Sequence, residues 1–460
     1  MPSSIRTELR PLLAMAIPVV TAELGWMAMG VVDTIMVGPL GPEAISAAGV
    51  GTSLHLGFNV FGMGMLLGLD TLVSQAFGRR DIRDCHRWLF DGLTLAALMA
   101  VPIMLACGVM WLAIPSLGFH PAVRPQLQSY FGIVALSTPF LLLYAACRRY
   151  LQGMHVVRPV MVALVTANVI NAGLNWVFIY GHLGFPALGV AGSALATLLA
   201  RVYMLGAVLV AVWWYDKRRT QEALGLPATV LSHVGLWHVD RVFDRSRLTR
   251  LITLGFPAAS QIAAEVGIFV LITAMAGMLD PISSASHQIA LNMAGTAFMI
   301  PLGMSSAGAV RVGHAVGAGD RSRAAAAGWT VILLATIVAI ASGVTFVLVP
   351  RQLIALFTAN PDVLKVGTGL LYLAALFQLF DGIQVVITGA LRGLGDTRSA
   401  MVVNLWAHWL FGLATSYLLC FVFGWGVWGL WVGLTLGLVI TGVILFYVWM
   451  AKIRHYQAAA

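Results

Sequence analysis

The chain has 460 residues, of which 60% are apolar and only 10% are charged. Soluble domains carry about 25% charged residues, so this composition excludes an ordinary soluble enzyme, a disordered chain and a disulfide scaffold. The formal net charge of +9 does not indicate a nucleic-acid partner, because membrane proteins gather Lys and Arg in their cytoplasmic loops. The apolar residues fall in long runs, which predicts an all-α polytopic membrane protein.

Twelve apolar runs are long enough to cross a bilayer as helices. In chain order they cover about 12–37, 45–75, 90–113, 127–150, 159–180, 187–214, 250–276, 283–312, 325–349, 364–390, 400–422 and 427–450. The only long polar connection, residues 216–249, separates six runs from six. We therefore predict an N-lobe over 1–215, a cytoplasmic inter-lobe linker over 216–249 and a C-lobe over 250–460.

The Lys and Arg residues predict the orientation of the chain in the membrane. With the N-terminus inside, 23 of the 27 basic residues fall in cytoplasmic segments. Only Arg124, Arg351 and Lys365 fall outside, and Arg201 lies within the sixth run. Cytoplasmic loops carry the excess of basic residues, so we predict that both termini are cytoplasmic.

The second half of the chain repeats the first. Helix-breaking and turn residues recur at a shift of 239 or 240, as in Pro18 and Pro257, Gly64 and Gly303, Gly78 and Gly317, Asp81 and Asp320, and Gly153 and Gly393. Six spans are an even number, so both halves enter the membrane from the same side. This pattern predicts two six-helix lobes related by a parallel pseudo-repeat, as in transporters with a cleft between their lobes.

Familiar catalytic and nucleotide-binding motifs are missing from the sequence. No Lys follows a Gly, so there is no Walker A lysine, and neither HExxH nor GxSxG occurs. We therefore predict a protein that is not an enzyme and has no cofactor. Transport would be passive or would draw its energy from an ion gradient.

Five carboxylates lie well inside the apolar runs: Glu23, Asp33, Asp70, Glu265 and Asp381. A charged side chain at the bilayer centre costs at least about 2.5–3.5 kcal/mol, so such residues usually face a cavity and serve a function. Asp70 lies near the cytoplasmic end of its span, where it can pair with an arginine. Glu23 lies about 80° around the helix from Asp33, and its role stays open.

Glu265 and Asp381 have polar neighbours at helical spacing. Gln261 lies one turn before Glu265, and Gln378, Gln384 and Thr388 form one stripe with Asp381. These carboxylates can take up and release a proton, or bind a bare cation with the help of amide oxygens. The alternative is a hydrogen bond that holds two helices together.

Asp33 precedes Gly38-Pro39, and a separate run carries Asn168, Asn171 and Asn175 on one helical face. Amide oxygens beside a carboxylate suit sodium or a proton relay, although hydrogen bonding between helices is an alternative. The i,i+4 pair His55 and Asn59 is interpreted as packing.

Several motifs resemble those of multidrug and toxic compound extrusion (MATE) transporters of the NorM type. They are Val32–Gly38, Ser74–Gly78, Ala264–Val266, His287–Asn292, Arg311–His314, Asp381–Val386 and Leu391–Gly393. The likeness covers both halves in the right order. It implies a two-lobed antiporter in the plasma membrane, the inner membrane of a bacterium, that expels cationic amphiphilic drugs in exchange for inward sodium or protons.

The resemblance also implies roles for particular residues. Asp33, Asn171, Asn175 and Thr197 would form an N-lobe cation or proton site, and Glu265 and Asp381 a C-lobe site; sodium, if used, would bind at one of these. Candidate residues of the substrate cavity are Gln261, Gln288, Asn292, Phe377, Gln378 and Gln384. Phe377 stands where some relatives have a tyrosine. The expected partners are organic cations and the lipid bilayer, without nucleic acid, and the chain would function as a monomer.

Two other transporter classes remain as alternatives. A major-facilitator transporter also has six plus six spans, and Gly78-Arg79-Arg80 resembles its loop between spans 2 and 3, but the usual preceding Asp is missing. A lipid or lipid-linked-sugar flippase would need several cleft arginines for phosphate, and only Arg201 lies deep in a span.

Overall fold

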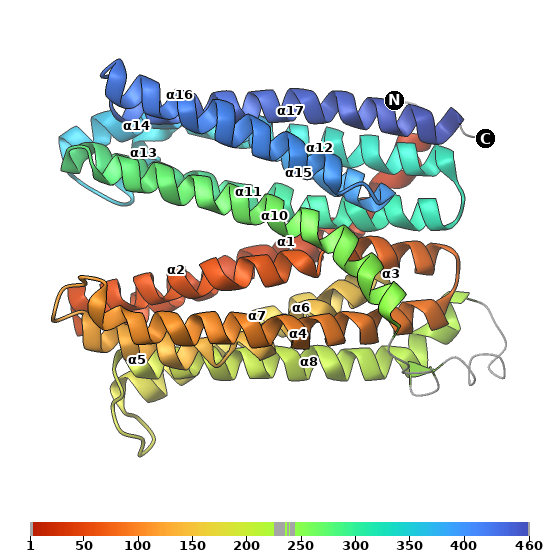
Figure 1. Cartoon of the computed structure of the whole chain (residues 1–460), viewed down its shortest axis with the longest axis horizontal. Helices are drawn as coiled ribbons and strands as arrows, with labels where there is room; N and C mark the ends of the chain where they lie inside the picture. Colours follow the sequence, from red (N-terminus) through yellow and green to blue (C-terminus); the bar gives the residue numbers. More distant parts are fainter. Residues whose placement is uncertain (1–2, 225–234, 237–238, 240–243, 459–460) are drawn as a thin grey trace. The chain divides into compact units, whose positions relative to one another are not determined.

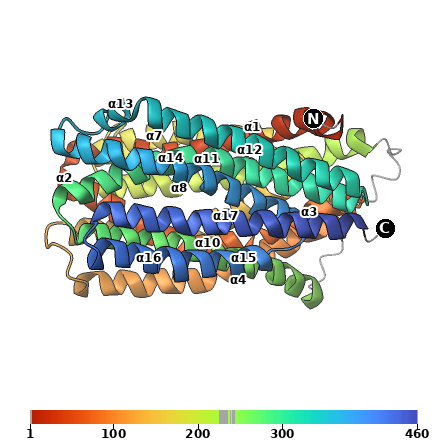
Figure 2. The ribbon, with the colours of Figure 1, turned by 90° about the horizontal axis from the view of Figure 1, so that it is seen from above.

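The computed structural model describes residues 3–224, 235–236, 239 and 244–458, and no β-strand occurs among them. The chain forms two compact units. Unit 1 comprises Met1–Glu23 and Ser260–Ala460, and unit 2 comprises Leu24–Ala259. Within each unit, long helices run side by side (Figures 1 and 2). The all-α class predicted from the sequence is confirmed.

Unit 2 contains the second part of α1 (Ser3–Val37) and the first part of α10 (Arg245–Gly277). Between them lie α2 (Pro42–Met65), α3 (Gly68–Gly78), α4 (Ile82–Ala113), α5 (Arg124–Ala135), α6 (Thr138–Gly153), α7 (Arg158–Tyr180) and α8 (Val190–Leu224). Short 3₁₀ turns cover Gly38–Leu40 and Ile114–Ser116.

Unit 1 contains the first part of α1, the second part of α10 and all later helices. These are α11 (Pro281–Gly317), α12 (Arg321–Leu348), α13 (Pro350–Ala355), α14 (Pro361–Leu394), α15 (Arg398–Asn404), α16 (Ala414–Tyr417) and α17 (Val427–Ala458). Two π-helical segments, Leu405–Leu413 and Leu418–Val422, join α15, α16 and the turn before α17 into one stretch.

Eleven stretches of the described helices are long and apolar enough to cross a membrane, and there are twelve if α5 and α6 count as one bent span. The two helices meet at 43° around Leu136 and Ser137. Pro139 lies in the first turn of α6, and it lacks the N–H group that would continue the hydrogen-bond ladder from α5. This agrees with the twelve predicted runs.

The predicted repeat is visible in the backbone. Residues with positive φ recur at equivalent places, namely Arg80 (62°) and Gly319 (73°), and His155 (64°) and Gly395 (90°). Asp81 and Asp320 follow the first pair, and each caps the next helix by accepting a hydrogen bond of 2.9 Å from the backbone N–H three residues later. The two halves therefore share both turn geometry and capping.

The helices α1 and α10 each belong partly to one unit and partly to the other. Their first parts pack closely at equivalent places. A Cβ atom on Gly64 of α2 would lie 2.5 Å from Ala259 Cα of α10, and one on Gly303 of α11 would lie 2.8 Å from Val20 Cα of α1. Only glycine allows these backbones to approach so closely. The start of α1 therefore packs with the C-terminal half, and the start of α10 with the N-terminal half.

This exchange places the unit boundaries within α1 and α10, whereas the sequence placed the lobes at 1–215 and 250–460. The predicted lobes stay a prediction, because local composition marks the polar linker but does not record which half each helix start packs against. Within the predicted linker, 216–249, residues 225–234, 237–238 and 240–243 lie outside the described part of the chain.

Candidate cation and substrate site

Four of the predicted coupling residues lie together in unit 2, contributed by α1, α7 and α8. Asn175 Nδ2 donates to Asp33 Oδ1 at 2.6 Å, and Thr197 Oγ1 donates to Asp33 Oδ2 at 3.1 Å. The same Asn175 nitrogen lies 3.2 Å from Asn171 Oδ1. All four side chains are buried. The carboxylate therefore has one neutral donor on each oxygen.

The amides beside Asp33 have unused hydrogen-bonding groups. Among the described residues, Asn175 Oδ1 and Asn171 Nδ2 have no partner. A buried amide oxygen next to a carboxylate is a typical ligand of a hard cation. Asn168, predicted on the same helical face, instead donates to the backbone oxygen of Gly25 at 3.0 Å and is not part of the Asp33 cluster.

Glu265 of α10 and Asp381 of α14 are connected by one amide in unit 1. Gln384 Nε2 lies 3.4 Å from Glu265 Oε1 and 3.4 Å from Asp381 Oδ1, and Gln261 Nε2 donates to the same Glu265 oxygen at 3.2 Å. Asp381 is buried and Glu265 is partly buried. The described ion pairs of unit 1 involve other residues, so no described basic side chain compensates these two carboxylates.

Buried polar groups continue along α14 on both sides of Asp381. Gln378 is fully buried, and neither its amide oxygen nor its nitrogen has a partner among the described residues; the same holds for the Thr388 hydroxyl. Buried polar atoms without partners are uncommon in proteins and need an explanation. A guest molecule or bound water that these atoms contact would provide one.

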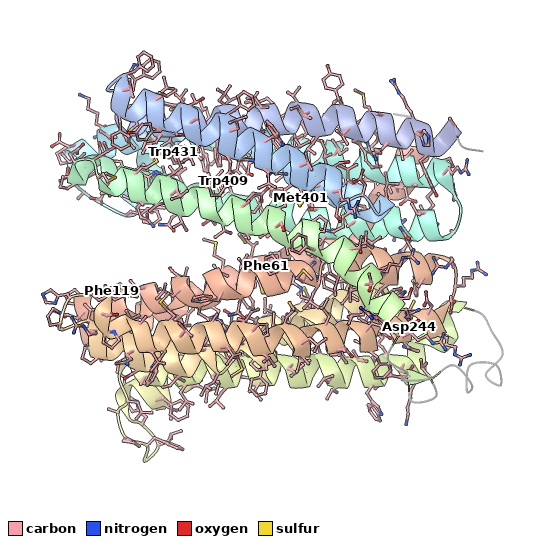
Figure 3. The ribbon with its side chains drawn as sticks, viewed as in Figure 1. Phe61, Phe119, Asp244, Met401, Trp409 and Trp431 are labelled. Carbon is pink, nitrogen blue, oxygen red and sulfur yellow. The ribbon has the colours of Figure 1, made fainter. Side chains whose placement is uncertain are left out.

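Aromatic side chains pack next to this stripe. The Phe377 ring lies 5.6 Å from the Trp431 ring and 6.2 Å from the Phe269 ring, measured between centroids. Trp431 lies toward the end of unit 1 opposite the chain termini (Figure 3). Its indole N–H donates to His287 Nδ1 at 3.2 Å, and His287 Nε2 lies 3.1 Å from Thr273 Oγ1. Since an indole can only donate, Nδ1 must be an acceptor, which fixes the tautomer of the ring.

Gln288 and Asn292 lie one turn apart on the same face of α11. Both are exposed, and Asn292 Nδ2 donates to the backbone oxygen of Gln288 at 3.0 Å. No described hydrogen bond joins either residue to Glu265 or Asp381. Their predicted part in a substrate cavity stays a prediction.

Asp70 lies in unit 2 and Glu23 in unit 1. Arg149 Nη1 forms an ion pair with Asp70 Oδ2 at 3.3 Å, which is the arginine pairing predicted for this position. Glu23 is buried at the end of the α1 segment that belongs to unit 1. The Asp70 pair explains how one buried carboxylate of α3 is tolerated.

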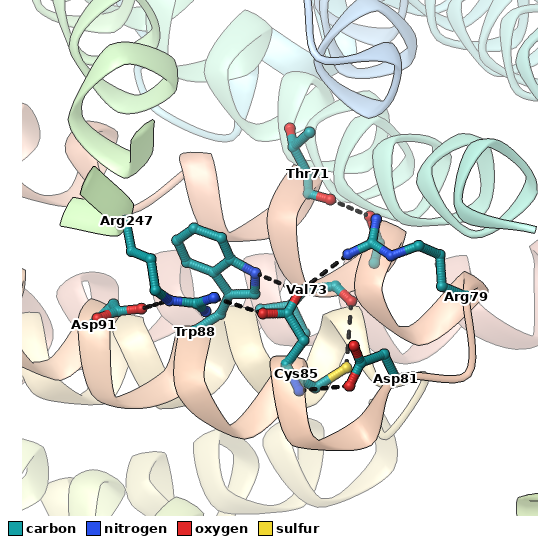
Figure 4. Close-up of polar contacts among 10 residues, drawn as sticks. Thr71, Val73, Arg79, Asp81, Cys85, Trp88, Asp91 and Arg247 are labelled. Atoms are coloured by element: carbon teal, nitrogen blue, oxygen red, sulfur yellow. Dashed lines mark hydrogen bonds and ion pairs between the residues drawn. The ribbon is translucent and has the colours of Figure 1, made fainter. Parts of the chain in front are cut away.

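A further charged cluster lies at the start of α4 in unit 2 (Figure 4). Arg247 of α10 bridges two carboxylates, Asp84 and Asp91, with N–O distances of 2.7 Å each. Its guanidinium carbon lies 3.8 Å from the centre of the Trp88 ring, and Trp88 Nε1 donates to Asp84 at 3.1 Å. These contacts hold the first turns of α10 against α4.

Sequence reasoning missed a second buried polar group in unit 2. It is centred on Arg201 of α8, whose Nη1 donates to Ser137 Oγ at 2.5 Å and lies 3.4 Å from each ring nitrogen of His55. The signal was present, since Arg201 is the one basic residue deep in a predicted span. The sequence pairs His55 only with Asn59, and its contact with Arg201 is not visible there because the two residues lie 146 positions apart along the chain.

Metal ligands of the transition-metal type do not gather in the described part of the chain, where no three His, Cys, Asp or Glu side chains converge. The two predicted sites instead offer carboxylate, amide and hydroxyl oxygens. Such oxygens suit a hard cation or a proton.

Helices of membrane-spanning length, an internal parallel repeat and buried carboxylates within the spans are typical of a polytopic membrane transporter. The MatE family model matches residues 18–177 and 257–418. The chain therefore belongs to the MATE family, which sets aside the major-facilitator interpretation, and its similarity to the relatives named NorM makes it NorM-type.

Relatives and solved structures agree with this assignment. The protein named "Probable multidrug resistance protein NorM" of Mesorhizobium japonicum is 34% identical over 459 residues, which cover 98% of this chain and 95% of the relative. "Multidrug resistance protein NorM" of Photobacterium profundum is 32% identical, covering 96% and 94%. The solved structure of the eukaryotic MATE transporter AtDTX14 has the same fold, with a TM-score of 0.84 at 21% identity over 99% of this chain and 100% of that one.

Proposed function

We propose that this protein is a secondary active multidrug efflux antiporter that exports cationic or amphiphilic organic compounds in exchange for inward Na⁺ or H⁺. The names of its NorM relatives support the drug-export part of the proposal. The observation that carries the coupling part is the pair Glu265 and Asp381, which share the single amide of Gln384.

Two carboxylates around one neutral donor favour competition between cations. A charge removed from water without a counterion is strongly destabilised, so these acids need a proton, a metal cation or an organic cation. Only one kind of occupant fits at a time if all of them use the same oxygens. Mutual exclusion at Glu265 and Asp381 then couples drug release to ion entry.

The Asp33 cluster of unit 2 is a second place where the coupling ion can bind. Its carboxylate and the free Asn175 oxygen provide ligands suited to Na⁺, and Asp33 alone suffices for a proton. The proposed exchange therefore needs a separate test for each ion and for each carboxylate cluster.

Aromatic and amide side chains support a role in binding flat amphiphilic drugs. Phe377 and Trp431 are buried in the hydrophobic core of unit 1. Their ring faces, which attract a cation by the quadrupole, would contact a guest only when this packing opens. The unpartnered amide of Gln378 adds a donor and an acceptor that suit chemically diverse guests.

We further propose that both termini face the cytoplasm of a bacterial inner membrane. Two contacts in unit 1 support this orientation, because they place both ends of the chain beside the basic start of α12. Glu8 Oε1 of α1 pairs with Arg323 at 2.8 Å, and the Tyr456 ring of α17 lies 5.6 Å from the Arg321 guanidinium carbon. Basic residues mark the cytoplasmic side.

The test uses the full chain reconstituted in proteoliposomes with ethidium as cargo. Ethidium movement is followed after a pH jump and, separately, after a Na⁺ jump, for wild type, Glu265→Gln and Asp381→Asn. The matched control is Asp362→Asn, which changes an exposed acid in the first turn of the same helix α14. We expect efflux to fall at least about tenfold in the two site variants, equivalent to about 1.4 kcal/mol, and to stay unchanged in the control.

Two results would overturn the proposal. Efflux at the wild-type rate from both site variants would remove the carboxylates from the mechanism. Failure of both ion gradients to move ethidium would remove antiport, and would revive the flippase alternative.

A further inference from the structure

Arg201 is a buried cation that forms no direct ion pair among the described residues, although the Asp33 carboxylate acts on it from a longer distance. It is the twelfth of the 28 residues in the span Val190–Lys217 and is only 9% exposed. Its Nη1 donates to a hydroxyl, Ser137 Oγ, and its Nε has no partner among the described residues. The described ion pairs of unit 2 involve other residues. A buried charge of this kind is strongly destabilising unless an anion compensates it.

A second positive feature lies beside the same guanidinium. Helix α6 is 16 residues long and begins at Thr138, directly after Ser137. Ser137 does not cap this helix, because its hydroxyl donates to the Val134 backbone oxygen at 2.5 Å and accepts from Arg201. The first turn of a helix carries partial positive charge and unsatisfied N–H groups. At the break in the bent span, the N-terminus of α6 therefore lies next to the guanidinium of Arg201.

Asp33 is a carboxylate that acts electrostatically on Arg201, but it forms no ion pair with it; the other neighbours add no negative charge. His55 faces Arg201 with its ring nitrogens 3.4 Å away, and a guanidinium has only donors, so the ring accepts in its neutral form. Asn59 is fully buried next to His55, and the Trp26 ring centre lies 6.0 Å from the Arg201 guanidinium carbon. These three side chains are neutral.

We infer that Arg201, Ser137, His55 and the first turn of α6 form a buried binding site for a monoanion. Two sources share this chemistry: the carboxylate of an exported zwitterionic compound, or a free chloride ion. The first source rests on the proposed function. In that case one molecule would span two subsites, because Thr197, which holds Asp33, lies one turn before Arg201 on α8, about 6 Å along the helix axis.

Equilibrium binding of two dyes to the purified full-length protein tests the substrate source. Rhodamine 110 carries a free carboxylate, and rhodamine 123 is its methyl ester with the same chromophore. Fluorescence polarisation is measured for wild type, Arg201→Gln and the control Arg124→Gln, which makes the same change at the start of α5 in the same unit. We expect Arg201→Gln to lower the affinity for rhodamine 110 at least about tenfold, or about 1.4 kcal/mol, and to leave rhodamine 123 binding unchanged.

A second measurement tests free chloride as the source. The thermal unfolding midpoint is compared in chloride and in gluconate at equal ionic strength. If chloride is the ligand, it raises the midpoint of wild type and of Arg124→Gln but not of Arg201→Gln, because a ligand that binds only the folded state stabilises it. If neither dye binds, this comparison alone decides.

The inference is overturned if neither dye discrimination nor the chloride effect depends on Arg201. Should Arg201→Gln fail to fold, Arg201→Lys replaces it. Lysine keeps the charge but lacks the planar donor fork, so a weaker anion preference supports the site and an unchanged one overturns it. Neither measurement uses an ion gradient. Failure of gradient-driven efflux would therefore contradict antiport but would leave the evidence for anion binding at Arg201 unchanged.

Discussion

Glu8 and Arg247 occupy equivalent positions in the two halves, 239 residues apart, and make the same contact with opposite charges. Glu8 in the first part of α1 pairs with Arg323 of α12 at 2.8 Å, and Arg247 in the first part of α10 pairs with Asp84 of α4 at 2.7 Å. Arg323 and Asp84 are themselves 239 residues apart. In both halves an ion pair therefore joins the first part of α1 or α10 to a neighbouring helix. The acidic and basic partners are reversed between the two halves.

Loss of the Glu8 carboxylate should destabilise the protein strongly. Glu8 and Arg311 are both buried and form an ion pair, and Glu8 also contacts Arg323. Glu8→Gln would leave the Arg311 charge buried without compensation, and we expect the free energy of unfolding to fall by about 3–5 kcal/mol. Unfolding of the purified protein in detergent measures this change.

The matched control for Glu8→Gln is Lys452→Gln. Lys452 pairs with Asp396 at 2.9 Å, but its side chain is 53% exposed. Water screens such a pair, so its loss should change the unfolding free energy by less than about 1 kcal/mol. Equal losses in the two variants would contradict the importance of the buried pair.

Close packing between α10 and α2 should make Gly255 intolerant of a side chain. A Cβ atom on Gly255 would lie 2.0 Å from the backbone oxygen of Met65. We expect Gly255→Ala to lower the unfolding free energy by about 1–3 kcal/mol or more, because neither backbone can move aside easily. In Gly206→Ala of α8 the new methyl group would meet no atom within 4 Å, so stability should be unchanged or slightly raised. A stable Gly255→Ala protein would show that the helices can separate.

Two asparagines of α7 separate the roles of coupling and packing. Asn175 donates to the Asp33 carboxylate, whereas Asn168 donates to backbone oxygens of Gly25 and Leu164. Under the proposed function, Asn175→Leu should reduce ion-driven ethidium efflux at least about tenfold, since a hydrogen bond to a charged group is worth about 1.5–3 kcal/mol. Asn168→Leu should lower stability modestly and leave the efflux rate of the folded protein unchanged. Equal efflux from both variants would remove Asn175 from the coupling site.

The cap of α12 should give a small acid-dependent loss of stability. The backbone N–H of Arg323 and the Ser322 hydroxyl donate to the Asp320 carboxylate, and they hold its pKa below the ordinary value. A folded-state pKa below the unfolded one stabilises the protein above the unfolded pKa of about 3.9, and this gain is lost as the pH falls further.

Asp320→Asn keeps the cap without the titration, so wild type should lose stability relative to this variant between about pH 5 and pH 3. Asp320→Ala should lose about 1 kcal/mol already at pH 7. Unfolding free energies of the three proteins at several pH values check both points. A constant difference between wild type and Asp320→Asn over this range would contradict them.

Contacts along one helix were predictable from the sequence. The spacing of 3 or 4 residues placed Gln261 beside Glu265, Gln384 beside Asp381 and Asn171 beside Asn175, since a helix turns about 100° per residue. Apolar runs longer than about 18 residues likewise predicted the spans, and turn residues at a constant shift predicted the repeat. Thr197 was assigned to Asp33 only through the family resemblance.

Contacts between helices were decided by the tertiary structure alone. Hydropathy gives each helix its length, but the rotation and depth of its neighbours depend on how side chains interlock across more than a hundred residues of chain. For this reason the sequence did not show that Ser137 meets Arg201, that Gln384 connects Asp381 with Glu265, or that the starts of α1 and α10 pack with the opposite halves. Composition and periodicity determined a two-fold repeated membrane transporter, and packing decided which of its few charges have partners.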